Sequence, residues 1–132
     1  MKEYSFELLV PKTIKYELKL KCIKQKKGGI FKGHIWEQIE LPFYSRNGLL
    51  LSLCMVSTLF KRNQIVVIHD AAQFAHPEFF SLLFGLWYRF VIRLLGQLAK
   101  HIITVSHFSK DELQKYAKIG PEKISVFYEG CD

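Results

Sequence analysis

Residues 64–70 read QIVVIHD, a short apolar run that ends in two ionisable side chains. Residues 64–68 are rich in β-branched side chains, which is typical of a strand that is buried on both faces of a sheet. Ligands of open α/β sheets bind outside the carboxyl ends of the strands. His69 and Asp70 therefore lie where binding or catalysis is expected, although a half-buried strand end followed by a turn explains the pair equally well.

Two more buried strands are predicted downstream, at residues 101–105 (HIITV) and 123–128, with a helix before each of them. Pro77 is suited to the first turn of a helix that continues to about residue 100. Ser109 and Glu112 have the spacing of a capping box, which predicts a second helix to about residue 118. The order strand, helix, strand, helix, strand favours right-handed crossovers and an α/β fold, with helices on both faces of a parallel sheet.

The first half of the chain has weaker patterns. Residues 4–10 predict a strand, and residues 14–22 alternate apolar with charged side chains, which predicts a half-exposed strand. Residues 25–33 predict a polar loop that contains glycine. Residues 34–41 predict two helical turns that end at the following proline, and residues 48–60 form an apolar segment of helical length.

Composition indicates a folded protein with a positively charged region. The 132 residues are 49% hydrophobic and carry a formal net charge of +7, with lysines concentrated near the N-terminus. The lysines could contact nucleic acid, anionic lipid or a phosphorylated substrate, or could form only a solvated face. The three cysteines, Cys22, Cys54 and Cys131, contain no CxxC pair, so we expect no disulfide framework, no zinc site and a reducing compartment.

Polar residues follow all three predicted strands of the second half. Parallel strands bring their carboxyl ends to one edge, so these residues are expected to meet at a single cleft. The N-terminus of the helix after Ser109 would point at the same edge and could hold a phosphate. A serine hydrolase is disfavoured because no GxSxG motif is present, and a metal-dependent phosphohydrolase because no HxxxH or HExxH motif is. The polar residues at the strand ends are His69 and Asp70, Ser106 and His107, and Glu129 and Gly130.

Several sequence motifs occur in a recognisable order. They are WEQIELPF at 36–43, VVIHD at 66–70, HPEFFS at 76–81, IITVSHFSKDEL at 102–113 and KISVFYEGCD at 123–132. Together they resemble the N-terminal domain of group 1, or family 4, retaining glycosyltransferases. The similarity is greatest to the bacterial mannosyltransferase-like branch that builds lipopolysaccharide and other surface polysaccharides. It covers residues 34–132 well and the first 33 residues weakly.

The resemblance implies the GT-B fold, in which two Rossmann-like domains with three-layer parallel sheets face each other across a cleft. The N-terminal domain of such enzymes handles the acceptor, and the C-terminal domain binds the nucleotide-sugar. Residues 1–132 are therefore expected to be a partial acceptor-side domain. We expect the donor domain, and the first strand with its glycine-rich loop, to be absent from these residues, and the chain to be inactive alone.

The resemblance also implies roles for individual residues. His69 is the expected catalytic residue because its counterpart lies near the transferred sugar. No metal and no cofactor are expected beyond the nucleotide-sugar, which is a substrate. The expected substrate-binding residues are Asp70, Ser106, Ser109, Lys110, Glu129, Gly130 and Asp132.

The predicted function is the retaining transfer of a hexose, with mannose as the candidate, from a nucleotide-sugar to a lipid-linked or polysaccharide acceptor. We expect a cytoplasmic protein, peripheral to the inner membrane through its basic, aromatic-rich surface, with no nucleic acid as partner. The oligomeric state is left open. The alternative is a non-catalytic basic α/β module that binds an anionic polymer or a membrane surface, and strong dependence on salt would distinguish it.

Overall fold

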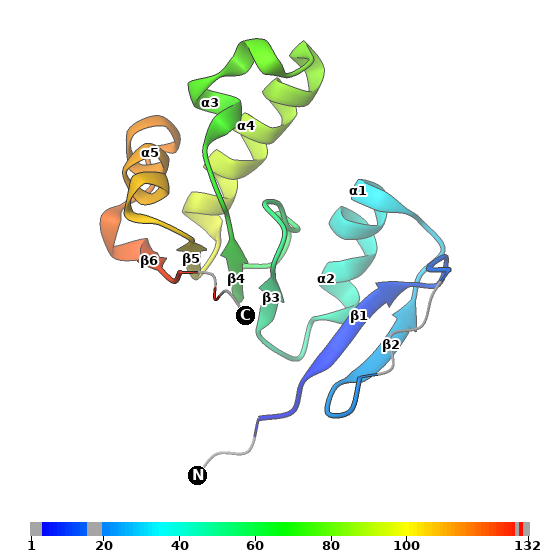
Figure 1. Cartoon of the computed structure of the whole chain (residues 1–132). Helices are drawn as coiled ribbons and strands as arrows, with labels where there is room; N and C mark the ends of the chain where they lie inside the picture. Colours follow the sequence, from blue (N-terminus) through cyan, green and yellow to red (C-terminus); the bar gives the residue numbers. More distant parts are fainter. Residues whose placement is uncertain (1–3, 16–19, 129, 131–132) are drawn as a thin grey trace. The chain divides into compact units, whose positions relative to one another are not determined.

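The computed structural model describes residues 4–15, 20–128 and 130, and the chain divides into two compact units (Figure 1). The N-terminal unit is Met1–Asn47 and the C-terminal unit is Gly48–Asp132. The first unit contains a two-stranded sheet, and the second contains a four-stranded sheet.

The N-terminal unit pairs β1 (Glu7–Pro11) in parallel with β2 (Lys24–Gly28). The second strand lies where a loop was predicted. The run predicted as a strand over 14–22 forms bends and irregular backbone in its described part, while residues 16–19 lie outside the described residues. Lysine is tolerated in β2 because Lys24, Lys26 and Lys27 are all exposed.

One helical segment follows, made of α1 (Gly33–Ile35), a π-helical turn (Trp36–Glu40) and α2 (Leu41–Tyr44). The prediction that this helix ends at Pro42 is wrong. A proline inside a helix lacks an N–H group, and its ring crowds the carbonyl four residues earlier. The wider π turn, closed by the Leu41 N–H donating to the Trp36 carbonyl, accompanies the proline and lets the helix continue.

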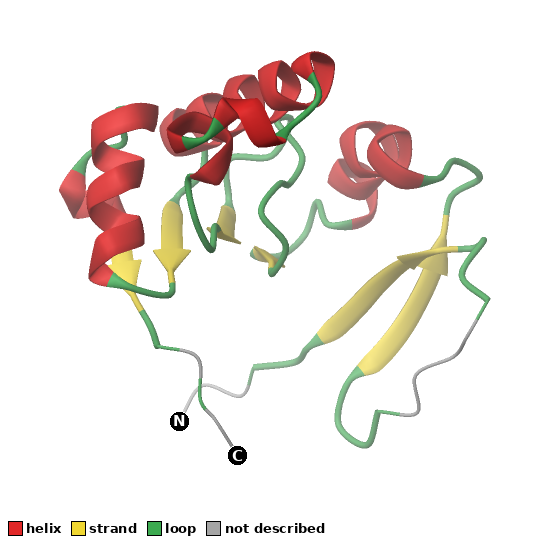
Figure 2. Cartoon of the chain, turned by 45° about the horizontal axis from the view of Figure 1, so that its top comes forward, coloured by secondary structure: helices red, strands yellow, loops and turns green. Residues whose placement is uncertain are grey.

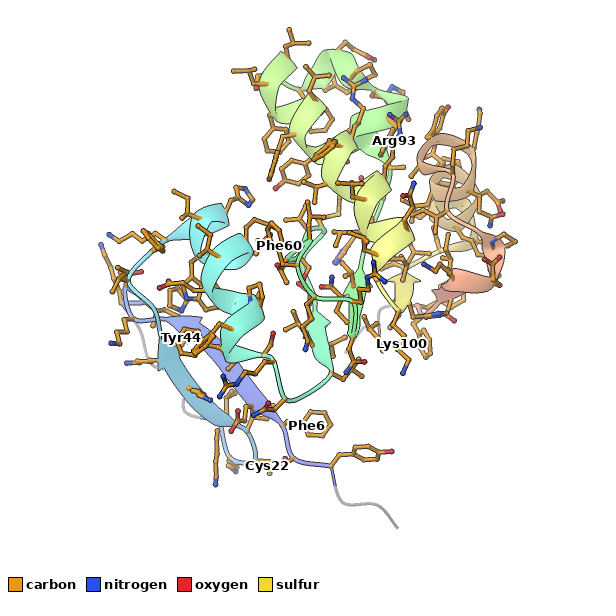
Figure 3. The ribbon with its side chains drawn as sticks, turned by 180° about the vertical axis from the view of Figure 1, so that it is seen from behind. Phe6, Cys22, Tyr44, Phe60, Arg93 and Lys100 are labelled. Atoms are coloured by element: carbon orange, nitrogen blue, oxygen red, sulfur yellow. The ribbon has the colours of Figure 1, made fainter. Side chains whose placement is uncertain are left out.

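Three side chains spaced one helical turn apart hold the backbone of residues 28–31. The indole Nε1 of Trp36 donates to the carbonyl of Gly28 at 2.9 Å. The hydroxyl of Tyr44, a residue labelled in Figure 3, accepts from the N–H of Gly29 at 2.9 Å. The Glu40 carboxylate accepts from the N–H groups of Ile30 and Phe31 at 3.0 Å. We call this arrangement the Trp-Glu-Tyr clamp.

We expect Gly29→Ala to destabilise the N-terminal unit by more than the strain of its backbone alone. Gly29 has φ +85°, and a Cβ atom there would lie 2.1 Å from Glu40 Oε2. Backbone strain of this kind costs about 1–3 kcal/mol, and the loss of the carboxylate hydrogen bonds adds to it. Gly33→Ala is the matched control, because Gly33 has φ +55° but no atom within 4 Å of the added Cβ.

Urea unfolding followed by Trp36 fluorescence in a Trp87→Phe background measures both variants. Equal destabilisation by the two substitutions would contradict the stabilising role of the clamp.

The C-terminal unit contains β3 (Leu50–Ser52), β4 (Gln64–Val67), β5 (His101–Thr104) and β6 (Ile124–Val126). All neighbours pair in parallel in the order β3-β4-β5-β6, with Ile65 opposite His101 and Ile102 opposite Ile124. The α/β class and the parallel arrangement of the three predicted strands are confirmed. The apolar segment at 48–60 is not a helix, because it forms β3 and then an irregular loop.

The helices of this unit are α3 (Ala72–Ala75), α4 (Leu82–Leu98) and α5 (His107–Ala117), with short 3-10 turns at Pro77–Phe79 and Pro121–Lys123. The helix predicted from Pro77 is interrupted, because Phe80 and Ser81 have extended backbones and α4 begins only at Leu82. The cap predicted at Ser109 is in fact Ser106, whose Oγ accepts from the Ser109 N–H at 3.0 Å.

Alternate residues of the strands form the core together with α4 and α5. Val66 and Ile102 are completely buried and pack with Ile92 and Leu95 of α4 and Leu113 of α5. Figure 2 shows the helices of this unit on one side of its strands. Right-handed crossovers that step across a sheet in one direction place their helices on one face. Helices were predicted on both faces of the sheet. Within the described part of this unit, they cover one face and no helix covers the other.

Candidate functional site

A hollow of about 430 Å³ lies at the carboxyl edge of β4. It is built by the loop after β3, the end of β4, α3 and the residue that precedes the N-cap of α4. Its lining combines apolar side chains with three polar ones. The lining residues are Leu53, Cys54, Met55, His69, Asp70, Ala72, Gln73 and Phe80.

His69 is half-buried at the rim of this hollow, where the prediction expected chemistry. Its ring Nε2 lies 3.2 Å from the carbonyl oxygen of Leu53, which ties the end of β4 to the loop after β3. Its own carbonyl accepts from the hydroxyl of Thr104 at 3.4 Å, which ties it to β5. The imidazole ring is therefore oriented by the loop after β3, and the backbone that carries it is bonded to β5.

Asp70 is exposed and also lines the hollow. Its Oδ1 accepts from the N–H of Ala72 at 2.9 Å, a local side-chain bond that closes the turn into α3. One carboxylate oxygen therefore has a structural role, and the carboxylate as a whole remains at the surface of the hollow.

The other predicted site residues do not line the hollow. Ser106 and Ser109 bond to each other and cap α5, with 3.0 Å between their hydroxyl oxygens. Lys110 donates from Nζ to the Ile124 carbonyl at 2.8 Å, so its ammonium group is bonded to the backbone of β6. Gly130 is exposed. Their substrate-binding roles stay predictions, and Glu129 and Asp132 lie outside the described residues.

Sequence reasoning missed the other contributors to the hollow, among them Met55, Gln73 and Phe80. Met55 and Phe80 belong to segments that were predicted as parts of helices. The only signal for Gln73 is that it is the single polar residue of the run AAQFA at 71–75.

Within residues 4–15, 20–128 and 130, no three or more His, Cys, Asp or Glu side chains group closely enough to hold a metal ion. Among the helices of the same ranges, none is long and apolar enough to cross a bilayer. Cys22 and Cys54 are free and exposed.

The family to which this sheet and its edge belong follows from comparison with known sequences. The profile of Glycosyltransferase Family 4 matches residues 43–132, which include the whole C-terminal unit. The chain therefore belongs to glycosyltransferase family 4.

One curated relative is similar to part of the chain. Over 71 residues the chain is 36% identical to the O-antigen chain mannosyltransferase RfbU of Salmonella typhimurium (strain LT2). The matched segment is 54% of this chain and 20% of that protein, so the chain spans about a fifth of the relative's length. No solved structure gives a significant match.

Proposed function

We propose that the protein to which these residues belong transfers a hexose from a nucleotide-sugar to a glycan or a lipid-linked acceptor, with retention of configuration. The observation that carries this proposal is the family match over residues 43–132, combined with a hollow at the carboxyl edge of β4 that His69, Asp70 and Gln73 line. Mannose is the proposed sugar because the relative is a mannosyltransferase.

In the proposed enzyme these residues form the acceptor side of a GT-B protein, and a second domain holds the donor diphosphate. His69 would hydrogen-bond to the reacting sugar and stabilise the charge that develops there. The contact of its ring with the Leu53 carbonyl supports this role, because a group that is oriented before reaction needs no reorganisation during it. No cofactor is proposed.

An exposed apolar surface beside the hollow supports a lipid-linked acceptor. We call it the apolar tip: Phe79, Leu82, Leu83, Leu86 and Phe90, which are between 50% and 81% exposed. Phe80, which lines the hollow, lies within the same stretch of chain. A lipid anchor held at the tip would therefore bring its sugar close to the hollow.

The charges on α4 fit an anionic membrane surface. The helix contains Arg89 and Arg93 and no acidic residue. Exposed Leu and Phe side chains next to arginine are typical of helices that lie in the membrane interface. We therefore propose a cytoplasmic protein that is peripheral to the inner leaflet.

Leu83→Asp is expected to weaken binding to phosphatidylglycerol vesicles by about tenfold or more, because burying a leucine stabilises the bound state by about 1.5–3 kcal/mol. Leu83 is 81% exposed, so the substitution should leave the fold unchanged. Phe60→Asp is the control, since Phe60 is 76% exposed and lies in the loop between β3 and β4 (Figure 3). Vesicle co-sedimentation measures both variants, and equal losses of vesicle binding would contradict the role of the apolar tip in membrane binding.

The function itself is tested with the full-length protein. We expect it to release nucleotide from a nucleotide-activated mannose in the presence of a lipid-linked glycan, and to give a product with the donor's anomeric configuration by NMR. A panel of nucleotide-sugars identifies the donor. Failure of every donor with every glycan acceptor would contradict the proposal.

A second candidate, the basic binding module, is favoured by the three exposed lysines of β2, Lys24, Lys26 and Lys27. Such a module would lose affinity for an anionic polymer steeply as salt rises. Sugar recognition by hydrogen bonds depends far less on salt, so a salt series on the intact chain separates the two candidates.

A further inference from the structure

Gln73 carries a polar atom that the fold leaves unsatisfied. Its side chain is 6% exposed and lines the hollow beside His69 and Asp70. Its Oε1 is buried and accepts no hydrogen bond from any described residue. An unmet buried acceptor costs stability, so native structures seldom retain one without a reason.

The other residues that line the hollow indicate what kind of ligand it would hold. The Asp70 carboxylate, which also lines the hollow, is another acceptor, so the ligand should carry several donors. Phe80 and Met55 add apolar surface to the same hollow. A pyranose sugar offers this combination, with hydroxyl donors around its rim and C–H groups on the face of its ring.

We propose that Gln73 is a specificity-determining residue whose Oε1 accepts a hydrogen bond from one hydroxyl of the acceptor sugar, while the ring packs against Phe80. The inference rests on the proposed function, because it takes the sugar of a glycosyltransferase acceptor as the occupant. It adds the residue that selects this sugar.

Selection follows from the burial of the oxygen. A sugar that presents its hydroxyl satisfies Oε1, whereas a deoxy analogue leaves the same buried acceptor unpaired. Sites that are built to bond one hydroxyl reject the analogue that lacks it more strongly than apolar pockets do. Gln73 should therefore discriminate between an acceptor and its deoxy form.

The first test separates a ligand-binding role from a structural one. In Gln73→Met the side chain keeps its approximate shape and loses the unmet oxygen, so the melting temperature should stay the same or rise. Gln97→Met, at an exposed position of α4, is the matched control. A clear fall in the melting temperature of Gln73→Met alone would overturn the proposal.

The second test uses Cys54, which is exposed and lines the hollow, as a reporter of occupancy. In a Cys22→Ser, Cys131→Ser background, a mannose disaccharide should slow alkylation of Cys54, and its monodeoxy analogues identify the hydroxyl that matters. Gln73→Met should weaken protection by about tenfold, which is the loss expected for one hydrogen bond. It should also abolish the difference between the disaccharide and the critical analogue.

The outcomes distinguish this inference from the proposed function. Glycosyl transfer by the full-length protein, with Gln73→Met retaining full preference for the hydroxylated acceptor, would overturn the inference and leave the function standing. Protection of Cys54 that depends on Gln73, in a full-length protein that transfers no sugar, would support the site without the function. Protection by a nucleotide-sugar and not by the disaccharide would overturn the assignment to the acceptor.

Discussion

His69→Ala in the full-length protein is expected to lower kcat by about 10²–10³-fold, the usual cost of removing one preorganised hydrogen-bonding group from a transition state. KM for the acceptor should change much less. His69 lines the hollow, and the bond of its ring to the Leu53 carbonyl orients the imidazole before substrate arrives, while Thr104 fixes the backbone of His69. An interaction that strengthens as charge develops contributes to kcat and not to ground-state binding.

His76→Ala is the matched control, because His76 is an exposed histidine that does not line the hollow. Steady-state kinetics with a soluble acceptor would give kcat and KM for each variant, and the melting temperature would show whether either substitution loosens the unit. A loss of activity shared equally by the two variants would contradict the role of His69. So would a rise in KM for His69→Ala without a fall in kcat.

Three strands of the sheet could be predicted because their sequence pattern is typical of a buried strand and not of a helix. Residues 64–68, 101–105 and 123–128 are apolar, β-branched and bounded by polar turns, and the structure confirms β4, β5 and β6 within those limits. The segment at 48–60 has the same apolar composition but no such limits. It folds as β3 and a loop, in which the buried hydroxyl of Ser57 donates to Oε1 of Gln64 at the start of β4.

The sequence predicted only those residues of the site that directly follow a strand. His69 and Asp70 are at the hollow because a residue that follows a parallel strand must lie at its carboxyl edge. Gln73 and Phe80 reach the same hollow through the turn at Asp70 and the interruption before α4. Neither bend has a distinctive sequence, so neither residue could be assigned in advance.

Gln64→Met is expected to destabilise the C-terminal unit by about 3 kcal/mol, the sum of the costs of leaving several buried polar groups unsatisfied. Gln64 is 0% exposed. Its Nε2 donates to the carbonyl of Thr58 at 2.7 Å and also to that of Lys61, and its Oε1 accepts from the hydroxyl of Ser57 at 2.7 Å. One amide thus fastens the loop after β3 to the first residue of β4.

Hydrogen exchange of the Ile68 amide, which donates to Ile103 across the sheet at 2.8 Å, measures this loss. A destabilisation of about 3 kcal/mol should speed its exchange through global unfolding by roughly 100-fold. Gln97→Met should leave the rate within about a factor of two, since surface substitutions change stability by about 0.5 kcal/mol or less. Unchanged exchange in Gln64→Met would show that the amide network does not hold the loop.

The same substitution at two buried glutamines should therefore have opposite consequences. Gln64 has protein partners for both ends of its amide, so methionine removes bonds that the fold uses. The Oε1 of Gln73 has none among the described residues, so methionine removes a cost to the fold. Loss of stability in Gln64→Met and loss of sugar recognition in Gln73→Met would show that the first amide stabilises the fold and the second binds the sugar. A large fall in stability for both variants would contradict that division.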